Sequence, residues 1–140
     1  MALAANLPAS LVVLNLNLLN CGCWNASAEA LAEKLPADLN RLTLVLGGNG
    51  VRTSHIEWRG ARALAQNLPR SLTQLSLHFG ECRFGDAGAQ ALAEKLPSGL
   101  TELSLFLHDT GMGEYGARAL ADNFARLKKL KILVLCVNYN

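Results

Sequence analysis

A pattern of about 30 residues is written several times along this chain, and this repetition constrains the fold more than any other feature. The clearest copy covers residues 72–97, LTQLSLHFGECRFGDAGAQALAEKLP. At its start Leu75, Leu77 and Phe79 alternate with polar residues, and a period of two predicts a strand with one apolar face. The glycine-rich segment GECRFGDAG follows and can turn sharply. The unit therefore begins with a strand and a tight turn.

The second half of the unit predicts a short amphipathic helix. Ala89, Leu92 and Leu96 recur at helical spacing and form part of one apolar stripe. Asp86 is the expected N-cap of this helix, and Pro97 ends it because proline cannot continue a helix. The strand and the helix each have one apolar face that neither can bury alone, so we expect the copies to stack.

The same unit recurs before and after residues 72–97. Helix-like segments repeat at residues 26–36, 59–69, 86–97 and 114–124. The second copy carries five extra residues within VRTSHIEW. By its length this insertion predicts a surface bulge, where Ile56 and Trp58 need cover from a neighbour. The third residue after the last inward strand position is, in successive copies, Cys21, Asn49, Cys82, Thr110 and Asn140, at steps of 28, 33, 28 and 30 residues.

These features resemble the leucine-rich repeats, in the long, helix-bearing subclass typified by ribonuclease inhibitor. The family frame of leucines, then Asn or Cys, then a helix is met in LSLHFGEC and LVLCVNYN, and the resemblance covers essentially the whole chain. It implies an α/β solenoid arc of about five strands and four full helices. The parallel sheet would line the concave face, and the short helices would lie on the convex face.

The resemblance also implies a ladder of short side chains that satisfies buried backbone groups and ties each turn to the next. Asn suits this role best, because Cys and Thr have fewer donors. Two residues further on, the convex turn is expected to bury a side chain. The ladder residues would be Cys21, Asn49, Cys82, Thr110 and Asn140, and the buried turn residues would be Cys23, Val51, Phe84 and Met112.

We expect one solenoid domain over residues 1–140, because no linker interrupts the pattern. No polar capping repeat is apparent at either end, although solenoids generally need one. The chain is therefore interpreted as a fragment, or as an uncapped array whose ends are covered by other subunits. The repeats would cover approximately residues 11–38, 39–71, 72–99, 100–129 and, in part, 130–140.

Composition and charge exclude several classes of partner. The net charge of +2 is too small to imply attraction to nucleic acid, and the basic run ARLKKLK (125–131) is interpreted as a solvated loop. The apolar start LPASLVVLNLNLLN matches the later strands and lacks the basic region of a signal peptide. We expect no nucleic acid and no direct membrane insertion.

The four cysteines do not predict disulfides. Cys21 and Cys82 would lie two strands apart, roughly 9–10 Å, beyond the usual Cα limit of about 7 Å. Reduced thiols favour an intracellular compartment, most simply the cytoplasm, with an organelle as the alternative.

No catalytic constellation is apparent. The glycine-rich segments GECRFGDAG and DTGMGEYG lack the Lys and Ser/Thr of a phosphate-binding Walker loop. His78, His108 and Cys136 fall near one another on the predicted sheet but supply no fourth metal ligand. We expect a non-enzymatic protein without a cofactor or a metal.

The predicted concave face has few charges and several apolar side chains, a composition typical of a surface that binds another protein. We therefore predict a protein–protein interaction module, and the alternative is a scaffold subunit of a larger assembly. A mildly apolar sheet of no specific use also stays open. The candidate contact residues are Arg41, Val45, His78, Glu102, Phe106 and Val134 on this face, with Ile56 and Trp58 on the bulge.

Overall fold

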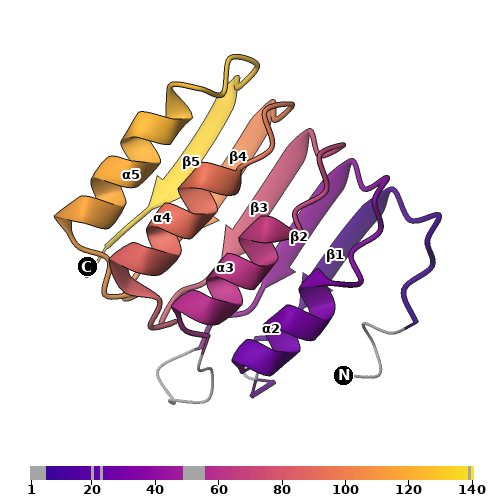
Figure 1. The fold of residues 1–140 in the computed structure, drawn as a ribbon, viewed down its shortest axis with the longest axis horizontal. Helices are drawn as coiled ribbons and strands as arrows, with labels where there is room; N and C mark the ends of the chain where they lie inside the picture. The colour runs from indigo at the N-terminus through magenta and orange to yellow at the C-terminus, as the bar shows by residue number, and fades with distance from the viewer. Residues whose placement is uncertain (1–5, 20, 23, 49–55, 139) are drawn as a thin grey trace.

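The computed structural model describes residues 6–19, 21–22, 24–48, 56–138 and 140. Within these residues strands and helices alternate along the chain, and the five strands form one sheet (Figure 1). The strands are β1 (Val13–Asn17), β2 (Arg41–Val45), β3 (Gln74–His78), β4 (Glu102–Phe106) and β5 (Ile132–Cys136). The helices are α2 (Asn25–Ala32), α3 (Trp58–Gln66), α4 (Gly85–Lys95) and α5 (Glu114–Phe124).

The sheet is parallel throughout, and its strands follow the order of the sequence, β1-β2-β3-β4-β5. Parallel neighbours need a crossover connection, and a helix lies between each described pair of successive strands. The register confirms the alternation that the sequence predicts. The first inward leucines are partners across all five strands: Leu14, Leu42, Leu75, Leu103 and Leu133.

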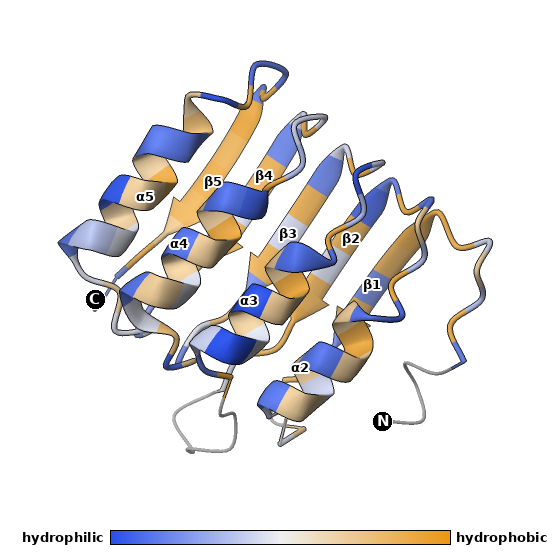
Figure 2. Ribbon diagram, in the orientation of Figure 1, coloured by the Kyte–Doolittle hydropathy of each residue, from blue (hydrophilic) through white to orange (hydrophobic). Residues whose placement is uncertain are grey.

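The four described helices cover one face of this sheet (Figure 1). The apolar side of each helix meets the leucine columns, and Figure 2 shows the polar turns on the outside. Leu42, Leu75 and Leu103 are at most 2% exposed, as are Leu31, Leu64 and Leu92 on the helices. Burying one such leucine stabilises the fold by about 1.5–3 kcal/mol. The predicted α/β architecture, with a five-stranded parallel sheet and four helices, is confirmed.

Each of the first three helices returns to the sheet through the same turn. The backbone N–H groups of Leu39, Leu72 and Leu100 donate to the carbonyls of Pro36, Pro69 and Pro97, each at 3.3 Å. The three leucines are fully buried, so this turn anchors the entry to the next strand. The proline that ends the helix thereby helps to fix the register of the strand that follows.

Helix α3 is capped from the preceding repeat rather than by its own N-cap residue. Asn25, the first residue of α2, accepts hydrogen bonds through Oδ1 from the backbone N–H groups of Glu57 and Gly60, at 2.9 and 3.1 Å. Helix N-termini leave such N–H groups without intrahelical partners. The first residue of one helix therefore satisfies the start of the next.

Asp86 repeats this arrangement between α4 and α5. Its Oδ1 accepts from the N–H groups of Gly113 and Gly116, both at 2.7 Å. The prediction that Asp86 is the N-cap of its own helix is wrong, because α4 begins at Gly85 with Phe84 as its N-cap residue. A Cβ at Gly116 would lie 2.7 Å from Asp86 Oδ1, so this close approach requires glycine.

Among the described residues of the predicted ladder, Cys82, Thr110 and Asn140 make polar contacts. Asn140 Oδ1 accepts from the backbone N–H and hydroxyl of Thr110 at 2.8 and 2.9 Å, and its Nδ2 donates to the carbonyl of Leu107. Cys82 reaches the Leu46 carbonyl of the preceding repeat with its thiol, at 3.9 Å. Cys82 and Thr110 are buried and Cys21 is exposed, whereas Asn49 lies outside the described residues.

Candidate functional site

We call the sheet face opposite the four helices the open face; its side chains stand in three columns across the strands. The strand register brings together the residues that the sequence alternation assigns to each column. The first column is Val13, Arg41, Gln74, Glu102 and Ile132; the second is Asn15, Thr43, Ser76, Ser104 and Val134; the third is Asn17, Val45, His78, Phe106 and Cys136.

His78 and Phe106 form a stacked pair in the third column. They are register partners on β3 and β4, and their rings lie 4.1 Å apart between centroids with an interplanar angle of 14°. Ser76 Oγ lies 3.1 Å from His78 Nε2. Burial, and to a lesser extent the charge of His108, lowers the pKa of His78 below its ordinary value of 6.5. At pH 7 a neutral imidazole can accept a hydrogen bond from the Ser76 hydroxyl and stack as an uncharged ring.

Two glycines beyond the strands allow His108 to lie close to this pair. A Cβ at Gly80 would overlap the His108 ring, and a Cβ at Gly47 would overlap the Gly80 carbonyl oxygen. Both glycines are buried. Small residues at these strand exits therefore bring the second imidazole onto the same end of the open face.

The first and second columns enclose a shallow polar hollow of about 150 Å³. Gln74 Nε2 donates to Glu102 Oε1 at 3.0 Å, so the Glu102 carboxylate is held toward β3. Arg41 lines the same hollow from β2 and is exposed. Arg41 and Glu102 thus flank Gln74 in one column and are not adjacent to each other.

The apolar part of the open face lies toward β5. Val134 is 42% exposed and Ile132 is 51% exposed. Val45 and Phe106 are only partly buried on the same face. Phe106 on β4 lies diagonally opposite Val134 on the neighbouring strand β5, and its aromatic ring is long enough to reach Val134. These residues surround the His78–Phe106 pair with apolar surface.

The predicted exposure of Ile56 is wrong. Ile56 is fully buried at 0% exposure, so its side chain cannot contact a partner. It stands four residues before Gly60, as Phe84 and Met112 stand before the equivalent glycines of α4 and α5. Ile56 therefore fills the core position that the sequence assigns to Val51, which lies outside the described residues.

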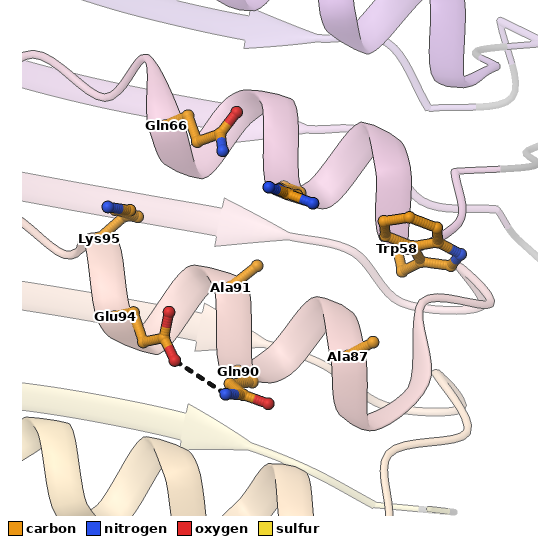
Figure 3. Close-up of a pocket in the computed structure, with 8 residues that line it drawn as sticks. Trp58, Gln66, Ala87, Gln90, Ala91, Glu94 and Lys95 are labelled. Atoms are coloured by element: carbon orange, nitrogen blue, oxygen red, sulfur yellow. Dashed lines mark hydrogen bonds between the residues drawn. The ribbon is translucent and has the colours of Figure 1, made fainter.

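Trp58 is 40% exposed, but it lies at the start of α3 on the helix side of the sheet. It lines a groove between α3 and α4 (Figure 3). Trp58 is therefore not part of the open face. The sequence prediction missed Ala87 and Ala91, which line the same groove. The signal was available, because α3 and α5 carry Arg59 and Tyr115 where α4 has Ala87.

Two further findings concern the residues that the structure describes. They contain no group of three or more His, Cys, Asp or Glu side chains placed to hold a metal ion. Among them, too, no helix combines the length and the apolar character that crossing a bilayer requires. The thiols of Cys21, Cys82 and Cys136 are reduced.

Comparison with known proteins adds no identification. No protein-family model matches this chain, and no curated protein matches it at a significant level.

Proposed function

We propose that this chain is a helix-bearing leucine-rich repeat module that binds another protein through its open face and has no enzymatic role. Support for the repeat class comes from the leucine columns in register, the helices on one face, and the ladder contacts of Asn140 with Thr110. In a solenoid of this class the open face is the concave one. The compartment we propose is intracellular, which agrees with the reduced thiols of Cys21, Cys82 and Cys136.

The observation that carries the binding proposal is the apolar group around Phe106. An aromatic side chain stands on the solvent side of a sheet, stacked on a neutral imidazole, with Val45 on one side and Val134 on the other. Aromatic side chains and surrounding aliphatics supply most of the energy in many protein interfaces. The hydroxyls of Thr43, Ser76 and Ser104 and the Gln74–Glu102 pair form a polar border.

The mechanism of binding is preorganisation. Five strands joined by backbone hydrogen bonds hold the columns in place, and the Phe106 ring is fixed by His78 before a partner arrives. Because few side chains must be ordered on association, less conformational entropy is lost. The exposed guanidinium of Arg41 at the border can orient a partner, which favours partners with a carboxylate beside an apolar patch.

The test is a charge placed at the centre of the apolar group. Phe106→Glu removes the ring and desolvates a carboxylate in any complex, so affinity purification from native lysate should lose the specific partners at least tenfold. Tyr115→Glu is the matched control, because Tyr115 is 82% exposed on α5 on the helix side. If Phe106→Glu retains the same partners in the same amounts as wild type, the open face is not the binding site.

A second candidate function is favoured by a different observation. Leu133 and Leu135 of β5 are 43% and 41% exposed, whereas their register partners Leu103 and Leu105 are fully buried. A subunit of a larger assembly would cover these two leucines with a neighbouring protein. Light scattering separates the two functions. A monodisperse monomer of residues 1–140 favours the binding module, and self-association that Leu135→Glu abolishes favours the assembly subunit.

A further inference from the structure

The helix side carries a groove of about 370 Å³ between α3 and α4, separate from the open face. Figure 3 shows Trp58 at one end of it and Gln66 and Lys95 at the other. Ala87 and Ala91 lie between these ends, four residues apart on α4. The groove is lined by Trp58, Arg62, Gln66, Ala87, Gln90, Ala91, Glu94 and Lys95.

The groove has room because α4 has a small residue where α3 and α5 have large ones. When the buried leucines of the helices are aligned, Ala87 corresponds to Arg59 in α3 and to Tyr115 in α5. Ala87 is exposed, so no packing requirement of the core explains the small side chain. A partner side chain can therefore approach the backbone of α4 here more closely than at α3 or α5.

Trp58 departs from the capping pattern of the repeats in the same place. Asn25 and Asp86, at the corresponding positions of α2 and α4, accept backbone hydrogen bonds from the next helix. An indole only donates, so Trp58 cannot make this contact with α4. The chain has a partly exposed aromatic where its own pattern places a capping side chain. Such departures from local consistency concentrate at functional sites.

The charge of the groove is predominantly positive. Arg62 and Lys95 line it, and the Arg59 guanidinium lies 5.4 Å from the centroid of the Trp58 ring. Glu94 is the acidic lining residue, and its Oε1 accepts a hydrogen bond from Gln90 at 2.8 Å (Figure 3). Among the lining residues two cations stand against one carboxylate, which favours an occupant with acidic side chains.

We propose that the α3/α4 groove docks an acidic, amphipathic helix of a partner protein. A third helix can lay a ridge of side chains into the groove between two helices, with an aliphatic residue over Ala87 and Ala91. Carboxylates one turn further along would meet Arg62 and Lys95. An extended segment fits less well, because two helices offer no free backbone edge for strand addition. This proposal does not depend on the open face.

The experiment is a selection of phage-displayed random peptides of about 16 residues on the full chain, with Ala87→Tyr as the matched counter-target. Ala87→Tyr restores the side chain that α5 has at this position and closes the groove. We expect enriched peptides with an excess of Asp and Glu and aliphatic residues at helical spacing. Their affinity should fall at least tenfold for Ala87→Tyr and for Arg62→Glu/Lys95→Glu, and should weaken with added salt.

Controls keep each outcome decisive. Ala26→Tyr places the same side chain at the corresponding exposed position of α2, so it should leave the affinity unchanged. Urea unfolding confirms that the variants fold. Peptides without acidic excess, or insensitive to Ala87→Tyr, overturn the proposal, as does a selection without enrichment over the counter-target. Peptides that lose binding to the Phe106→Glu variant instead bind the open face. A peptide that keeps its affinity when a proline replaces its central residue is not bound as a helix, and this result overturns the helical occupant.

Discussion

The imidazole of His78 lies against the ring of Phe106, with 4.1 Å between centroids and 14° between planes. The contact joins β3 to β4 on the open face, where side chains would otherwise meet water. It is a cross-strand aromatic pair, and it is the fixed point around which Val45 and Val134 are arranged. Its dependence on the protonation of His78 makes it testable in solution.

Stability should depend on pH through His78. Its pKa is lowered by burial and by the charge of His108, so the unfolded chain binds a proton more readily than the folded chain. Neutral His78 therefore contributes fully to the free energy of unfolding above its ordinary pKa of 6.5. This contribution is lost as the pH falls through the lower pKa of the folded state. Urea unfolding from about pH 7.5 to about pH 5 should show a steeper fall for wild type than for His78→Gln. Equal pH slopes would contradict this assignment.

Asp86→Ala should destabilise the fold by about 1–2 kcal/mol, because two N–H groups at the start of α5 lose their acceptor. Asp86→Asn is the control. It keeps the Oδ1 acceptor, and Asn25 makes the same contact with α3, so its cost should be smaller. Urea unfolding measures both values. Equal losses for the two variants would show that charge, and not the hydrogen bonds, supports α5.

Gly116→Ala should destabilise the chain although alanine favours helices. An added Cβ would lie 2.6 Å from Met112 Cγ and 2.7 Å from Asp86 Oδ1, so the cap or the core contact must shift. We expect a cost of about 1–3 kcal/mol. The corresponding residue of α2 is Ser27, and Ser27→Ala should change the unfolding free energy by about 0.5 kcal/mol or less. A gain in stability for Gly116→Ala would refute the close packing described for α5.

Ile56 and Trp58 should respond differently to truncation. Ile56→Ala leaves a cavity at a fully buried position and should cost about 2–5 kcal/mol. Trp58→Ala removes a side chain that is 40% exposed and should cost about 1 kcal/mol, while its effect on peptide binding to the groove should be large. Thermal and urea unfolding give the first comparison. Similar costs at both positions would restore the prediction of a shared exposed bulge.

The strands and their register could be predicted from the sequence because leucine alternation is a local signal. Counting residues along the repeat gave the wrong buried turn residue in the second repeat, because that repeat contains an insertion. Counted forward from Asn49, the buried turn residue is Val51; counted backward from Gly60, it is Ile56, which the structure buries. An insertion breaks the first count and preserves the second, because the helix sets the packing partner.

The role of Asp86 could not be read from its own repeat. The groups that it binds belong to Gly113 and Gly116, 27 and 30 residues further on. Local capping rules favour the nearer helix, whereas the stacking of neighbouring helices decides the outcome. The groove beside Trp58 was missed for the same reason, since Ala87 is informative only in comparison with Arg59 and Tyr115.

Site-specific photocrosslinking tests the proposed binding face most directly. Benzoylphenylalanine replaces Phe106 in one protein and Tyr115, exposed on α5, in the other, and each is irradiated in native lysate. The proposed function predicts a discrete crosslinked partner from position 106 that is absent from position 115. No crosslinked partner from position 106, or the same partners in equal yield from both positions, would contradict it.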